Sequence, residues 1–154
     1  MKITKVVLAV TFVIVANTLS ACSTSTTQNI HDLSVEASGA NMPMGSDGMM
    51  SGSTDGSATG TFTVNEDLKD ICFSIMTKRL TGVTEAHIQV TASEEDVVVF
   101  DITKMNMMNK SCMNVEPGIL MDMLAQPNKY SLMVHTNEFP DGAVMGSLIA
   151  LGGQ

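Results

Sequence analysis

The sequence predicts an all-β fold: a β-sandwich of seven to eight short strands with one short helix. Short segments rich in β-branched residues recur along the chain, with turn residues between them. Residues 130–148 read as a β-hairpin, because strand-like alternation leads into Pro140-Asp141-Gly142 and a second apolar run follows. A helical pattern occurs between Pro117 and Pro127. Greek-key connections, as in immunoglobulin-like sandwiches, are the default for such a chain.

The expected strands follow one another from residue 32 onward. Weak alternation marks residues 32–37 as the first strand. The next expected strands cover residues 61–64, 71–77, 84–91, 96–102 and 111–115. In the final hairpin Gly146 lies between Val144 and Leu148, and a glycine within a strand often marks the close approach of another backbone. Residues 40–60 are rich in Gly, Ser, Met and Asp and are expected to form a long flexible loop.

Composition limits the classes of function. The chain has 154 residues, a formal net charge of −8 and 14 methionines. An acidic chain without a basic cluster cannot neutralise phosphates, so nucleic acid is excluded as a partner. No G-x-S-x-G or other nucleophile motif occurs, and the sequence therefore predicts no enzyme and no catalytic residue.

The N-terminus predicts export and lipidation. Lys2 and Lys5 precede a short apolar run that ends in Leu19-Ser20-Ala21-Cys22, which resembles a bacterial lipoprotein box. Residues 1–21 are thus expected to be a signal peptide, 22–31 a polar tether and 32–154 the folded domain. Acyl chains such as palmitate on Cys22 would anchor the protein to the membrane. This places it in the cell envelope, facing the periplasm or the exterior, on the outer membrane in a Gram-negative host. The alternative is an ordinary signal peptide that leaves Cys22 as a spare thiol.

The chain has three cysteines, and an odd number in an exported protein leaves one without a disulfide partner. Lipidation of Cys22 would account for that one and leave two cysteines that can pair. Cys72 and Cys112 both lie in strand-like runs, and an oxidising compartment favours a disulfide between them. Closing a loop of about 40 residues stabilises a fold by about 4 kcal/mol in the chain-entropy model. Two buried free thiols are the alternative.

The final hairpin resembles the C-terminal signature of the CHRD (chordin-type) domain. The matching residues are Tyr130, Val134, His135, Thr136, Pro140, Gly142, Gly146 and Leu148. Further similarity lies in residues 60–64, 71–75, 80–88 and 119–130 and at Cys112. The resemblance implies an extracytoplasmic β-sandwich but little about activity, because microbial members share no known reaction.

Two histidines are candidate metal ligands. CHRD domains commonly carry His-Ile-His and a later Val-His, which loosely resembles the copper-ligand pattern of superoxide dismutases, also β-sandwiches. Here His87 and His135 match, but Gln89 replaces the middle histidine. An amide is a poor ligand for copper, which argues against dismutase chemistry. Alternatively, both histidines hydrogen-bond within the fold.

Methionines are the second set of candidate ligands, because thioethers suit Cu(I). Those in the expected loop are Met42, Met44, Met49 and Met50. A second cluster comprises Met105, Met107, Met108 and Met113. The alternative, adaptable filling of the core, applies to Met121, Met123, Met133 and Met145.

The sequence thus favours a lipid-anchored CHRD module that binds an unknown envelope protein or polymer, or that has a structural role. The alternative is an envelope copper-binding protein that uses the methionine loops, with His87 and His135.

Overall fold

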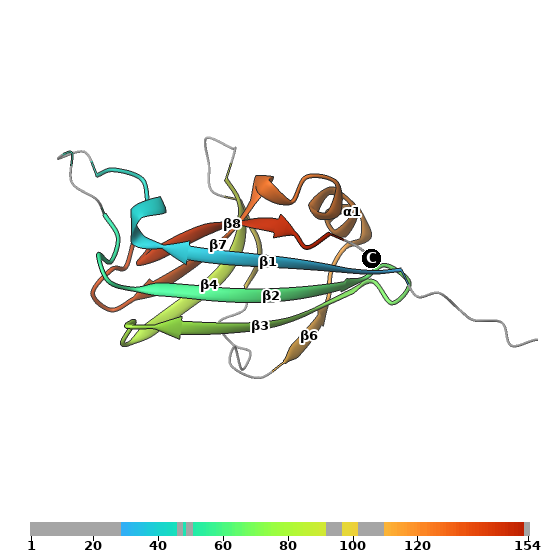
Figure 1. Cartoon of the computed structure of the whole chain (residues 1–154), viewed down its shortest axis with the longest axis horizontal. Helices are drawn as coiled ribbons and strands as arrows, with labels where there is room; N and C mark the ends of the chain where they lie inside the picture. The colour runs from blue at the N-terminus through green and yellow to red at the C-terminus, as the bar shows by residue number, and fades with distance from the viewer. Residues whose placement is uncertain (1–28, 46–47, 49–50, 92–96, 102–109, 153–154) are drawn as a thin grey trace, which may run out of the picture.

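The computed structural model describes residues 29–45, 48, 51–91, 97–101 and 110–152 (Figure 1). The strands are β1 (Ile30–Ser38), β2 (Ser57–Asn65), β3 (Asp70–Lys78), β4 (Val83–Val90), β5 (Val97–Asp101), β6 (Ser111–Asn114), β7 (Tyr130–Thr136) and β8 (Val144–Ala150). The helical segments are η1 (Gly39–Asn41), α1 (Pro117–Ala125) and η2 (Pro127–Lys129). The predicted all-β class with one α-helix is confirmed.

The strands form one antiparallel sheet that curls over on itself. Their order is β5-β4-β7-β8-β1-β2-β3-β6, and each neighbouring pair is antiparallel. Five strand spacings separate β3 from β4, a lateral distance of about 24 Å in a flat sheet. Residues 79–82 join these two strands, and a chain of that length spans at most about 18 Å. The two halves must therefore face each other, so one continuous sheet makes the sandwich.

The core lies between these halves. It contains Leu33, Phe62 and Phe73 from one half and Ile88 and Leu132 from the other, all at most 1% exposed. The predicted alternation in the hairpin is also confirmed, since the remaining core residues include Tyr130, Val134, Val144 and Leu148. Burial of these apolar side chains is the main driving force for the fold.

Helix α1 packs onto the core and is tied to the chain that follows it. Leu120 and Met123 are its buried residues. Asp122 accepts hydrogen bonds from Lys129 Nζ at 2.6 Å and from the Tyr130 hydroxyl at 2.5 Å. The hydrogen bond from Lys129 is the largest of the effects that hold the pKa of Asp122 below its ordinary value. Burial and the Asp122 carboxylate raise the pKa of Tyr130. The charged carboxylate therefore anchors the start of β7.

The β7–β8 hairpin requires glycine at two positions. Gly142 has a φ of +125°, a conformation that side chains disfavour. A Cβ on Gly146 would collide with the carbonyl oxygen of Glu36 on β1. The structure thus bears out the expected close approach of a second backbone at Gly146.

The disulfide predicted between Cys72 and Cys112 is present. The two residues are direct register partners on β3 and β6. Because β6 has four residues and lies at the edge of the sheet, the bridge holds it against β3. The loop closed by the bridge contains the whole of β4.

Two sequence-based expectations were wrong in detail. Strand β1 begins at Ile30, inside the expected tether. The expected loop 40–60 is shorter, because β2 already begins at Ser57. Ala58 and Gly60 face the core there, and such small residues do not produce a visible apolar alternation.

The chain between β1 and β2 also packs more closely than expected. The Ser53 amide donates a hydrogen bond to the Ala143 carbonyl at 2.8 Å, which fixes this segment to the end of the β7–β8 hairpin. Met42 is consequently buried, with 6% exposure.

Candidate metal site

The candidate site lies on the face of β4 and β7 that points away from the main core. Ala86 and Ile88 of β4 face the core, so Glu85, His87 and Gln89 project from the opposite face. That face is nevertheless covered, because His87 is 5% and Gln89 1% exposed. Buried polar side chains outside a core require partners, and their partners define the site.

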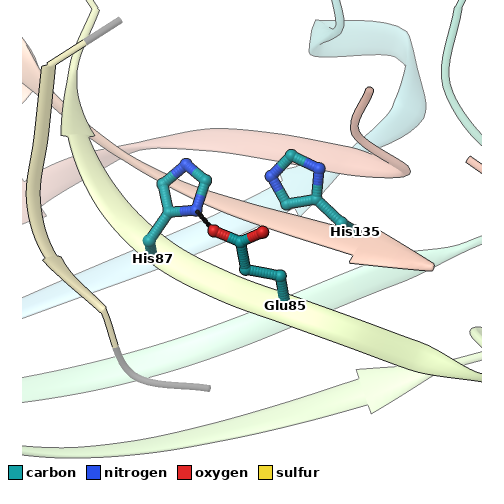
Figure 2. A group of neighbouring side chains, drawn as sticks. All are labelled: Glu85, His87 and His135. Atoms are coloured by element: carbon teal, nitrogen blue, oxygen red, sulfur yellow. Dashed lines mark hydrogen bonds and ion pairs between the residues drawn. The ribbon is translucent and has the colours of Figure 1, made fainter. Parts of the chain in front are cut away.

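Strand register brings His135 to the same place. Glu85 on β4 is the direct partner of His135 on β7. One ligand atom each from Glu85, His87 and His135 lies within 4.8 Å of the others. Figure 2 shows the Glu85 carboxylate reaching toward the two imidazoles, whose ring centroids are 5.0 Å apart. Three donor groups thus converge on one point.

Nδ1 of His135 forms a hydrogen bond within the fold, and this bond determines which ring nitrogen is available as a metal ligand. Nδ1 of His135 lies 2.8 Å from the Pro140 carbonyl oxygen and must donate its hydrogen there, since a carbonyl only accepts. In the neutral ring Nε2 then carries a lone pair. Among the described residues this buried Nε2 has no hydrogen-bond partner. A backbone carbonyl that fixes the tautomer while the other nitrogen stays available is typical of a metal-ligating histidine.

His87 is held in a similar way by Gln89. The Gln89 amide oxygen lies 2.8 Å from His87 Nε2 and accepts its hydrogen. Nδ1 of a neutral His87 then presents a lone pair to the Glu85 carboxylate, 3.2 Å away. Two electron-rich atoms facing each other repel, and a cation bound between them would remove this repulsion. The arrangement therefore suits a bound cation between Glu85 and His87.

The site is closed on one side and open on the other. The His87 side chain is 6% exposed, whereas that of Glu85 is 51% exposed. On β5, Asp101 is the register partner of His87, so its side chain projects from the same face of the sheet. A cation can reach the imidazoles past these acidic groups, and the acidic surroundings attract it.

The candidate metal ligands predicted from the sequence lie in different parts of the structure. His87 and His135 come together, Met42 is buried beside the hairpin, and Met44 is 72% exposed. Met49, Met50 and Cys22 lie outside the described residues, as do residues 1–21 and Met105, Met107 and Met108. Of the methionines expected to fill the core, Met123 does so, but Met121 is 65% exposed.

Sequence reasoning missed Glu85 as a third candidate ligand and Gln89 as the partner of His87. The spacing Glu-x-His-x-Gln places all three side chains on one strand face, and this signal was available in the sequence.

The fold is a small all-β sandwich, and Glu85, His87 and His135 cluster on one face of its sheet. The chain belongs to the CHRD domain family, whose profile matches residues 33–148. This family suggests an extracellular module with a binding or structural role. No curated protein and no solved structure matches the chain. Within the described ranges, no helix is long and apolar enough to cross a membrane.

Proposed function

We propose that this chain is an envelope lipoprotein whose CHRD domain binds one transition-metal ion through Glu85, His87 and His135. The observation that carries the proposal is His135 Nε2, a buried lone pair without a partner among the described residues, aimed at two further donors. A buried acceptor left unpaired costs about 1–3 kcal/mol, and a metal ion would offset that cost. The protein acts by binding, without catalysis.

The donor set indicates which ions fit. Two neutral imidazoles and one carboxylate suit Zn²⁺ and Cu²⁺ and leave at least one position for water or another ligand. Affinity for such a site rises along the first-row series to a maximum at Cu²⁺. Copper(II) is therefore expected to bind more tightly than zinc.

Equilibrium dialysis of the purified protein against buffered Cu²⁺ or Zn²⁺ tests the proposal. We expect one retained ion per chain, and strongly reduced retention in Glu85→Gln and His135→Asn. A matched control is His31→Gln, because His31 also pairs with a glutamate (Glu66, 2.9 Å) but lies outside the cluster. Failure of the wild-type protein to retain either ion, or equal losses in the His31 control, would refute the proposal.

Lipid attachment at Cys22 is the second part of the proposal. The lipoprotein-like segment ending in Leu19-Ser20-Ala21-Cys22 supports it, and β1 begins eight residues after Cys22, close enough to keep the domain near the membrane surface. Metabolic labelling with a palmitate analogue tests it: we expect label in the wild-type protein and none in Cys22→Ala. Label that persists in the variant would contradict the assignment.

Binding of an envelope polymer or protein is a second candidate function. A groove of about 430 Å³ lies beside the start of β1, lined in part by Ile30, Leu124 and Leu151, and Ile30 and Leu151 are each 47% exposed. Exposed apolar side chains around a groove favour contact with another surface. Cosedimentation with isolated cell-wall sacculi would support this candidate, and recovery of all protein in the supernatant would argue against it.

A further inference from the structure

Two buried methionines form a pair outside the main core. Met42 is 6% and Met133 5% exposed, yet neither belongs to the core cluster of the described residues. A Cβ built on Gly142 would lie 3.2 Å from Met42 Sδ and 3.3 Å from Met133 Sδ. The two sulfurs therefore flank a single point of the β7–β8 hairpin, and their separation cannot exceed the sum of these two distances.

Met133, one of the two thioethers, lies beside the histidines on the sheet. Met133 is the direct register partner of His87 and precedes His135 by two residues on the same strand. These three side chains therefore rise from one face of the sheet, with the Cβ atoms of the paired residues about 5 Å apart. The Pro140 carbonyl that fixes His135 lies two residues before Gly142.

Two glycines, Gly52 and Gly142, leave the space that the Met42 side chain occupies beside the β7–β8 hairpin. Gly52 approaches Met42 so closely that a Cβ there would lie 2.5 Å from Met42 Cγ. Gly142 likewise leaves room only because it has no side chain, since a Cβ would collide with the Met42 methyl group. A segment of small polar residues thus encloses one long thioether side chain against the hairpin.

We propose that Met42 and Met133 supply thioether ligands with which the site also holds Cu(I), together with the lone pair of His135 Nε2. Thioether and imidazole donors match the softness of Cu(I), whereas the Glu85 carboxylate matches divalent ions. The site then has a hard side at Glu85 and a soft side at the two sulfurs. This inference rests on the proposed metal site and names the ion that the fold retains under reducing conditions.

The test compares Cu(I) and Zn²⁺ affinities of the purified full chain without oxygen. A chromophoric Cu(I) chelator serves as competitor, and the variants are Met42→Leu with Met133→Leu and, as a matched control, Met44→Leu. Leucine nearly conserves the volume of methionine, so the fold is expected to survive. Loss of a ligand should weaken Cu(I) binding by at least the roughly 10- to 100-fold seen when an outer-shell partner of a metal ligand is lost. Zn²⁺ affinity should stay unchanged in both proteins.

Methyl NMR provides a readout that does not depend on a variant. With ¹³C-methyl methionine in the wild-type protein and Ag(I) as a redox-inert substitute for Cu(I), the signals of Met42 and Met133 should shift. Those of the exposed Met44 and Met121 should not.

The outcomes separate the two proposals. If the wild type retains Zn²⁺ but the double variant binds Cu(I) as tightly as wild type, or if the two methyl signals do not move, the thioether inference is overturned and the Glu85, His87 and His135 site stands. If the wild type binds neither ion, both proposals fail.

Discussion

Removing the Cys72–Cys112 disulfide should destabilise the domain by about 4 kcal/mol. The bridge joins residues 40 apart in sequence, and in the chain-entropy model closure of such a loop removes about 4 kcal/mol of unfolded-state entropy at 25 °C. For a small domain whose total stability is about 5–15 kcal/mol, this is a large share. With a urea m-value of about 2 kcal/mol per molar, the midpoint of unfolding should fall by about 2 M.

Urea denaturation of Cys72→Ser with Cys112→Ser, followed by circular dichroism, measures this change. The wild-type protein in reductant provides the matched comparison, and its curve should superimpose on that of the variant. The folded variant should retain its metal affinity, because the bridge lies on β3 and β6 whereas the site lies on β4 and β7. A loss of less than about 1 kcal/mol would show that the unfolded chain is already compact around this loop, and would refute the entropy calculation.

Three further predictions concern single substitutions, the first of which has a matched control. Gly146→Ala should destabilise the domain by about 1–3 kcal/mol, because its Cβ would collide with the β1 backbone. Gly152→Ala, where no atom lies within 4 Å, should leave the melting temperature unchanged. Gln89→Leu should weaken metal binding about 10- to 100-fold by releasing His87, and unchanged affinity would exclude a positioning role. Asp122→Asn should lower the free energy of unfolding at pH 7. Because the folded pKa of Asp122 lies below its ordinary 3.8, its stabilisation is complete above that pH and is lost as the pH falls through the folded pKa. The difference between variant and wild type in urea titrations should therefore shrink toward pH 2, and a constant difference would contradict this.

Local chemistry in the sequence predicted much of the fold. Pro117 and Pro127 bracket the helix, which runs from Pro117 to Ala125, and the turn at Pro140-Asp141-Gly142 joins β7 to β8. These features depend on the backbone restrictions of proline and glycine, which act within a few residues. For the same reason the close approach at Gly146 was predictable, although its partner on β1 was not.

The site was only partly predictable, because it depends on strand register. The spacing of Glu85 and His87 places them on one strand face, but only the pairing of β4 with β7 places Glu85 opposite His135. Register is set by the whole sheet and by the turns, and it is not encoded near Glu85. The burial of Met42 was not predicted, for a related reason. Its Gly- and Ser-rich neighbours indicated a solvated loop, but Gly52 instead allows the backbone to pack tightly around it.

The metal site on β4 and β7 is tested most directly by pulsed electron paramagnetic resonance of the wild-type protein loaded with one equivalent of Cu²⁺. We predict modulation from the remote nitrogens of two equatorial imidazoles, reduced to one in His135→Asn and unchanged in His31→Gln. A spectrum without imidazole modulation, or one that is the same in the His135 variant, would contradict the claim that β4 and β7 build a metal site.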